Sequence, residues 1–453
     1  MKSNLSMAVC AIATTLAPQS VFAASDAEVA ELRRQLAILT ERLNELEQKQ
    51  VEVEQDLEKT EAAAAANAGP TEGPGAAVRA GAKPGSFIFP GTDTEITLGG
   101  YLKADFIYDL DEDVGDFFIP ETLTTGAGQN DANAFSFAAR ESRLNLRTRT
   151  PTEYGDFKTL FEADFVGSPT FGETFSNSFN FRLRHAVADF GPVKVGQFWS
   201  LFTPLIAYPN TVDFQGPAGI PFQRQAQVRY TYKDDNLTLA ASIENPETTA
   251  TLFSDTGPFG SINSSTPVGG VGTISFDAAP DFIAAATYKT KAGPVKLAGL
   301  ARSLSVDTTD DNAFGYGLHA AARLSFWDGG TFQLQGGYGK GIGRYLINGS
   351  GLGAFQSADG DLDAIEAYGF SAFYSHKLTD SLTAQIGYGR YEVLDDIPIP
   401  ASLDNVQTVH ATLYYSPFKN VVLGAEAIWG ERNNQGPGSD DALRLQTSVQ
   451  YNF

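Results

Sequence analysis

Cysteine is almost absent from this sequence, and the single one, Cys10, lies close to the N-terminus. It falls inside an apolar run, Leu5 to Leu16, which follows Lys2 and precedes Val21-Phe22-Ala23. A positive residue, an apolar core and small residues predict a secretory signal peptide over 1–23. A lipoprotein would need Cys10 as its first mature residue, and its place within the apolar core argues against that. The mature chain then has no cysteine, which excludes disulfides and cysteine metal sites.

Long hydrophobic runs are also missing beyond the signal. No later segment has the ~18 consecutive apolar residues of a membrane helix. Yet hydrophobic residues make up 42% of the chain, with 45 Gly, 32 Phe and 17 Tyr. Because only helices and closed barrels satisfy every backbone group in lipid, a membrane location would require strands.

Histidine is scarce, and acidic residues outnumber basic ones. None of the four histidines has a metal-ligand spacing with a second histidine. Ser375 and His376 are adjacent, but consecutive strand residues face opposite sides, which argues against a Ser-His pair. We therefore expect no enzyme, no metal and no cofactor. The formal net charge of −22 argues against a nucleic-acid partner.

What is present is clearest at the C-terminus, from Ala442 to Phe453. Apolar or lipid-compatible residues alternate there with polar ones, so one face suits lipid and the other suits water. Ending on such a strand, with a terminal aromatic, resembles the C-terminal signature of bacterial outer-membrane β-barrels. That resemblance implies recognition of Phe453 by the barrel assembly machinery.

The segment after the signal has a different period. Its apolar residues recur at spacings of three and four, which predicts a coiled coil over 24–60 with Gln50 at a core position. An Ala/Gly/Pro-rich flexible linker is expected over 61–90, before a β-barrel over 91–453. The seam residues are Val29, Leu32, Leu36, Leu39, Leu43, Leu46, Gln50, Val53 and Leu57.

From Glu95 onward the period is two. About sixteen strand-like segments follow, and the connections between them alternate between short and long, as in transmembrane barrels with short periplasmic turns. The sequence therefore predicts an all-β transmembrane barrel of about sixteen antiparallel strands. The segments lie near 95–109, 137–150, 156–166, 179–190, 192–198, 223–233, 236–245, 281–289, 294–302, 313–326, 331–340, 364–377, 381–391, 405–415, 420–430 and 441–453.

Three stretches carry a more specific resemblance: the barrel opening G-S-F-I-F-P-G-T-D-T-E-I-T-L-G-G-Y-L-K-A-D-F-I-Y-D, S-R-L-N-L-R-T-R-T-P at 142–151, and V-G-Q-F-W-S-L-F at 195–202. With the signal, coiled coil and linker, they resemble the DcaP-like family of trimeric outer-membrane porins. The resemblance implies a homotrimer among outer-membrane lipid and lipopolysaccharide, with the coiled coil in the periplasm. It also implies pores that favour small anionic solutes, dicarboxylates in particular.

Strand alternation directs a set of cations into the lumen, where charge avoids the cost of facing lipid. One interpretation is that each merely solvates a wet wall and pairs with Asp105, Glu162, Asp164, Glu366 or Glu426, also expected inward. As a cluster, however, guanidinium groups near the waist bind carboxylates and concentrate anions. The expected pore-lining residues are Arg143, Arg147, Arg182, Arg184, Arg229, Lys296, Arg323 and Arg444.

The long connection from Trp199 to Phe222 is unusually apolar for an external loop and contains four prolines. It occupies the position at which trimeric porins fold a loop into the lumen. A loop packed on the rim or at a subunit interface is the competing interpretation. The expected constriction residues are Trp199, Phe202, Tyr208, Asp213 and Phe214.

Together these features predict an outer-membrane porin for passive diffusion of small anions. Two alternatives remain open: a phosphate-type anion porin, which an arginine ladder would serve equally well, and a structural protein whose coiled coil tethers the envelope.

Overall fold

The computed structural model describes residues 78–110, 112–125, 132–172, 176–251, 277, 279–306, 311–349, 351–356, 361–397 and 402–453. The predicted signal peptide and coiled coil lie outside these residues. No helix in the described part of the chain is long and apolar enough to cross a membrane.

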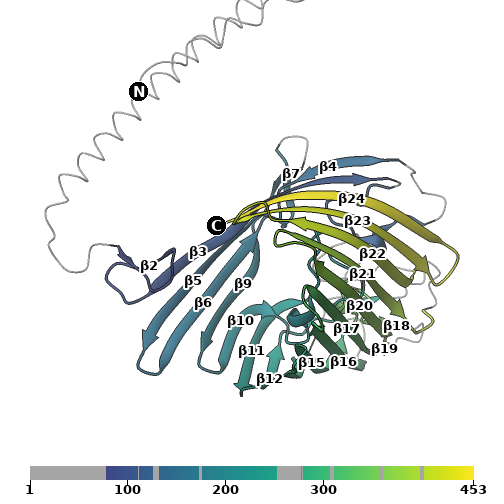
Figure 1. Ribbon diagram of the computed structural model, residues 1–453. Coiled ribbons are helices and arrows are strands. Elements are labelled where there is room, and N and C mark those ends of the chain that lie inside the picture. Colours follow the sequence, from purple (N-terminus) through teal and green to yellow (C-terminus); the bar gives the residue numbers. More distant parts are fainter. Residues whose placement is uncertain are drawn as a thin grey trace, which may run out of the picture. The chain divides into compact units, whose positions relative to one another are not determined.

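Sixteen long antiparallel strands pair in chain order, and the last pairs with the first, so the sheet closes into a barrel (Figure 1). Closure pairs Arg444 with Asp109 and Asn452 with Tyr101. The strands are β3 (Glu95–Asp109), β5 (Arg143–Thr152), β6 (Gly155–Asp164), β9 (Arg182–Phe190), β10 (Val193–Trp199), β11 (Arg224–Lys233), β12 (Leu237–Glu244), β14 (Asp281–Lys289), β15 (Pro294–Ser305), β16 (Asn312–Leu324), β17 (Gly330–Lys340), β20 (Glu366–Lys377), β21 (Leu382–Val393), β22 (Leu403–Tyr415), β23 (Val421–Asn434) and β24 (Ser439–Asn452).

Short elements accompany the barrel. Strand β4 extends the wall beside β3, and β13, β18 and β19 form a separate small sheet. The remaining elements are β1 (Arg79–Ala80), β2 (Ser86–Ile88), β4 (Ala134–Ala138), β7 (Pro169–Gly172), β8 (Ser178–Phe179), β13 (Ala250–Thr251), β18 (Ala354–Gln356), β19 (Leu362–Ala364) and the 3-10 turns η1 (Pro120–Thr122), η2 (Leu205–Ala207) and η3 (Gly343–Tyr345).

The end of the predicted linker requires a correction. Residues 79–80 and 86–88 are strands, and β2 pairs with the start of β3 through Ser86 and Thr97. The hydroxyl of Ser86 and the amide of Lys83 both donate to Glu95, which fixes this segment against the wall. The sheet therefore begins at Arg79 rather than at residue 91.

The alternation of the last strand shows how the barrel meets its surroundings. Leu445, Val449 and Tyr451 are about half exposed on the outer face, whereas Arg444 and Gln446 are buried on the inner face. Successive strand side chains point to opposite faces, so an apolar outside and a polar inside follow from the sequence.

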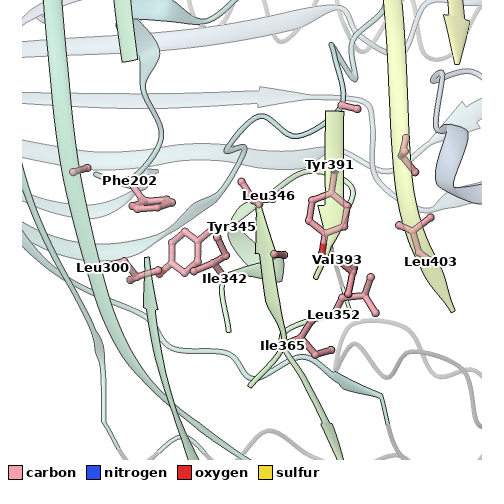
Figure 2. Packing of buried hydrophobic residues seen from close by; sticks show 14 of the residues in the cluster. Phe202, Leu300, Ile342, Tyr345, Leu346, Leu352, Ile365, Tyr391, Val393 and Leu403 are labelled. Carbon is pink, nitrogen blue, oxygen red and sulfur yellow. The ribbon is translucent and has the colours of Figure 1, made fainter. Parts of the chain in front are cut away.

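The inside is not entirely polar, because two long connections pack against it. These are L3 (residues 200–223), between β10 and β11, and L6 (residues 341–365), between β17 and β20. Phe202 of L3 and Ile342 and Tyr345 of L6 pack with Leu300 of β15 in one buried cluster (Figure 2). Each fully buried side chain of this size contributes about 1.5–3 kcal/mol, so the cluster holds L3 and L6 against the wall.

Candidate functional site

The loop L3 crosses the lumen. The chain leaves β10 at Trp199, and its backbone carbonyls at Tyr208 and Asn210 accept hydrogen bonds from Gln333 of β17 (2.7 Å) and Gln385 of β21 (2.5 Å). Farther along, the Asp213 amide donates to Glu426 of β23 at 2.8 Å. These strands are far from β10 in the order of the sheet, so L3 lies inside the barrel.

Wall side chains satisfy the backbone of L3. The ammonium of Lys296 donates to the carbonyls of Leu201 (2.6 Å) and Thr203 (3.0 Å), and that of Lys103 donates to Val212 at 2.7 Å. The Ala218 amide donates to the Thr408 hydroxyl at 3.0 Å. A buried backbone group without a partner is costly, and here barrel side chains supply the partners.

A cavity of about 410 Å³ lies between L3 and the wall. One side is formed by Tyr101, Arg143 and Arg184 from strands β3, β5 and β9, and Trp199 and Phe222 lie where L3 leaves and rejoins the wall. The lining also includes Lys103, Glu141, Tyr208, Asp213, Phe214, Tyr414 and Gln450.

Four guanidinium groups form what we call the arginine cluster: Arg143 and Arg184 line this cavity, and Arg182 and Arg224 contact rings that line it. Arg182 and Arg184 make hydrogen bonds of 2.8–2.9 Å to Asp164, and Arg184 also donates to Glu162 at 2.8 Å. Arg143, Arg182 and Arg184 thus share two carboxylates, and no carboxylate among the described residues pairs with Arg224. The cluster has more positive than negative charge.

Aromatic rings contact the guanidinium groups of the arginine cluster. The guanidinium of Arg224 lies 4.6 Å from the Trp199 ring centre and 5.2 Å from that of Phe222. Arg182 and Arg184 lie 5.5 and 5.4 Å from the Phe214 ring of L3. Cation–π contacts of this kind hold planar guanidinium groups in a defined orientation.

A second set of charges, part of which lines the same cavity, is mostly acidic. The Lys103 ammonium lies 2.5 Å from Glu141 and 3.1 Å from Asp105. The guanidinium of Arg444 is fully buried and pairs with Asp109 at 2.7 Å and with Asp213 at 3.4 Å. Two cations here accompany four carboxylates, so acidic groups outnumber basic ones in this second set.

The other residues expected to line the pore lie in different surroundings. Lys296 and Arg444 donate hydrogen bonds to L3, and Arg229 donates to the Trp199 carbonyl at 2.6 Å. Arg147 and Arg323 are exposed, with no ion pair to any residue that the structure describes. Among the residues expected in the constriction, Trp199, Tyr208, Asp213 and Phe214 line the cavity, whereas Phe202 lies in the buried cluster with L6.

The structure places two charged residues differently from the prediction. Glu366 was expected inward, and that expectation is wrong: it shares a face with exposed Phe370, pairs with Lys340 at 3.4 Å and accepts a hydrogen bond from Tyr338. Arg224 was not anticipated, because it has the parity of the exposed residues of β11. Its one sequence signal is its position two residues after Phe222, the last aromatic residue of L3.

Within the described ranges, no group of three or more His, Cys, Asp or Glu side chains could hold a metal ion. Basic and acidic side chains both line the cavity between L3 and the wall.

Comparison with known proteins agrees with this geometry. A structure of the outer-membrane channel DcaP of Acinetobacter baumannii is similar at 22% identity, with a TM-score of 0.68 over 80% of this chain and 97% of that one. An anion-selective porin from Comamonas acidovorans is similar at 12% identity, with a TM-score of 0.51 over 80% of this chain and 100% of that one. Both likenesses concern the fold. The comparison with curated proteins returned no match.

The family model for the Porin subfamily matches residues 84–452, which is nearly all of the barrel. A closed antiparallel sheet of sixteen strands lies within the range of outer-membrane barrels. The chain belongs to the Porin subfamily, and it is an outer-membrane channel rather than an enzyme.

Proposed function

We propose that the protein is a porin for passive diffusion of small anions, dicarboxylates in particular. The observation that carries this is the arginine cluster, whose four guanidinium groups have only Glu162 and Asp164 as ion-pair partners. A low-dielectric wall focuses such a field and raises the local concentration of anions. The guanidinium fork also matches the two oxygens of a carboxylate.

The strongly acidic chain as a whole does not oppose this proposal. A solute in the cavity lies within about one Debye length, ~8 Å, of the cluster, whereas charges on external loops are screened. The sign of selectivity should therefore follow the cluster rather than the net charge of −22.

The test is the reversal potential of the purified protein in a planar lipid bilayer under a salt gradient. We expect anion selectivity at physiological salt, and a shift toward cations when Arg143→Gln and Arg147→Gln are combined. Since Arg147 is exposed, the Arg143 change should cause most of the shift. Arg149→Gln, on the same strand but paired with Asp156 at 2.7 Å, is the control. A cation-selective wild-type pore would refute the proposal.

A phosphate-type porin is the nearest alternative, because guanidinium groups bind phosphate as well as carboxylate. Titration of the open-channel current with succinate and with inorganic phosphate separates the two. Block at lower concentrations of succinate supports the dicarboxylate assignment, and stronger block by phosphate replaces it.

We also propose a homotrimer with an N-terminal periplasmic coiled coil. The support is the resemblance to the DcaP-like porins and the heptad pattern over 24–60. Sedimentation of the detergent-solubilised protein, with bound detergent accounted for, gives the stoichiometry.

A further inference from the structure

The four members of the arginine cluster differ in how they are neutralised. Asp164 accepts from Nε and Nη2 of Arg182 (2.9 and 2.8 Å) and from Nη1 of Arg184 (2.8 Å). Glu162 accepts from Nε of Arg184 at 2.8 Å. Arg182 and Arg184 thus have hydrogen-bonded counter-ions, and Arg184 is almost fully buried.

Arg143 lacks such a bond. Its Nη1 lies 3.6 Å from Oε1 of Glu162, an oxygen that already accepts from Arg184. That distance is too long for a hydrogen bond. The Nε of Arg143 is buried without a hydrogen-bond partner, while its guanidinium lies 5.0 Å from the Tyr101 ring centre.

Arg224 is less neutralised still. No carboxylate among the described residues pairs with it, and its Nη1 is buried without a hydrogen-bond partner. It lies within electrostatic reach of Arg182 and Arg184, which repel it. Its contacts are the rings of Trp199 and Phe222, which offer no oxygen acceptor.

A buried donor without an acceptor is costly, and the cost is larger for a charged group. A passing anion can supply the acceptor. We propose that Arg143 and Arg224 are the anion-binding pair of this channel, whereas Arg182 and Arg184, with Glu162 and Asp164, hold the wall in shape. This proposal rests on the proposed function and assigns its site.

The assignment also narrows the chemical class of solute that the channel would bind. Two guanidinium groups without hydrogen-bonded counter-ions match a dianion, and the flanking rings fix the planes in which carboxylate oxygens must lie. Lysine would keep the charge but lose both the fork and the ring stacking. Binding should therefore depend on arginine itself, whereas the sign of selectivity should depend mainly on charge.

The experiment compares charge-conserving variants in planar bilayers, with the concentration of succinate that halves the current as the readout. We expect Arg143→Lys and Arg224→Lys each to raise that concentration about tenfold. Loss of one hydrogen bond to a charged group weakens binding by roughly that factor. The reversal potential in potassium chloride should stay on the anion side. Arg149→Lys, outside the cavity on the strand of Arg143, should leave both values unchanged.

The decisive comparison is with Arg182→Lys, which should raise the half-blocking concentration less than Arg224→Lys does. Resistance of each variant to heat dissociation on gels verifies folding. Equal effects at Arg182 and Arg224, or no effect at Arg224, would overturn the assignment while an anion-selective wild type kept the proposed function intact. A cation-selective wild type would instead remove the function itself.

Discussion

Single residues decide how closely L3 approaches the wall. Gly219 has φ +76, and a Cβ there would lie 2.0 Å from the Arg390 carbonyl oxygen. A Cβ on Gly369 or Gly389 would likewise meet the backbone of L3, at 2.3 and 2.4 Å. Glycines from L3, β20 and β21 thus form one seam where two backbones touch.

Gly216 provides a matched test of this seam, since it has the same φ of +76 in L3 but only Ile220 Cδ1, at 3.3 Å, as its nearest neighbour. Gly216→Ala should cost about 1 kcal/mol from backbone strain alone. Gly219→Ala should cost more and also displace the loop, because its clash is with backbone. Thermal unfolding and open-channel current noise measure the two effects; equal behaviour of the variants would mean that the seam does not fix L3.

Glu121 gives the loops a pH dependence. It lies in η1, outside the strands, and its carboxylate accepts from Asn348 of L6 at 2.7 Å, while Asn348 accepts from the Gly219 amide at 3.0 Å. Burial raises the pKa of Glu121 from 4.5 to about 7, against the opposing effects of Asn348 and Arg432. Between about pH 4.5 and pH 7 the folded state therefore keeps a proton that the unfolded chain has released.

The direction of the pH dependence of stability follows from the difference in bound protons between the folded and unfolded states. The contribution of Glu121 is fully present below pH 4.5, the unfolded value, and is lost as pH rises through about 7. Glu121→Gln stays neutral, so the difference in melting temperature between pH 5 and pH 8 should be smaller in this variant than in the wild type. An unchanged difference would assign the pH dependence to other groups.

At the scale of elements, the terminal strand β24 closes the barrel against β3. Backbone bonds between Phe453 and Gly100 continue this pairing, while the Phe453 side chain remains half exposed. The side chain therefore contributes little burial to the finished barrel. Its resemblance to the terminal aromatic of outer-membrane proteins implies a role in recognition during assembly.

Phe453→Ala should accordingly lower the yield in the outer membrane while the inserted protein keeps its heat resistance. Quantitative blotting of membrane fractions and heat-dependent gel mobility measure the two effects. Normal insertion of a weakened barrel would reverse this interpretation.

At the scale of the whole molecule, we expect oligomerisation not to depend on the coiled coil alone. Four heptads with Gln50 at a core position give modest stability, whereas porin barrels bury large apolar flanks between subunits. Deletion of residues 24–70, behind the intact signal, should leave a conducting oligomer. Recovery of monomers only would contradict this expectation.

The sequence by itself determined the sixteen strands, and their bounds differ from the structure by a few residues at most ends, because period-two alternation is a local property of the chain. The sequence also indicated that the connection after β10 is unusually apolar and rich in proline. Tertiary structure decided three further features. Lys296 and Arg444 bind L3, Arg143 lacks a hydrogen-bonded counter-ion, and Arg224 joins the cluster although its parity is that of the outward residues. Alternation gives only a residue's face, whereas its charge partners come from other strands and from a loop that crosses the lumen. Those neighbours exist only once the barrel has closed.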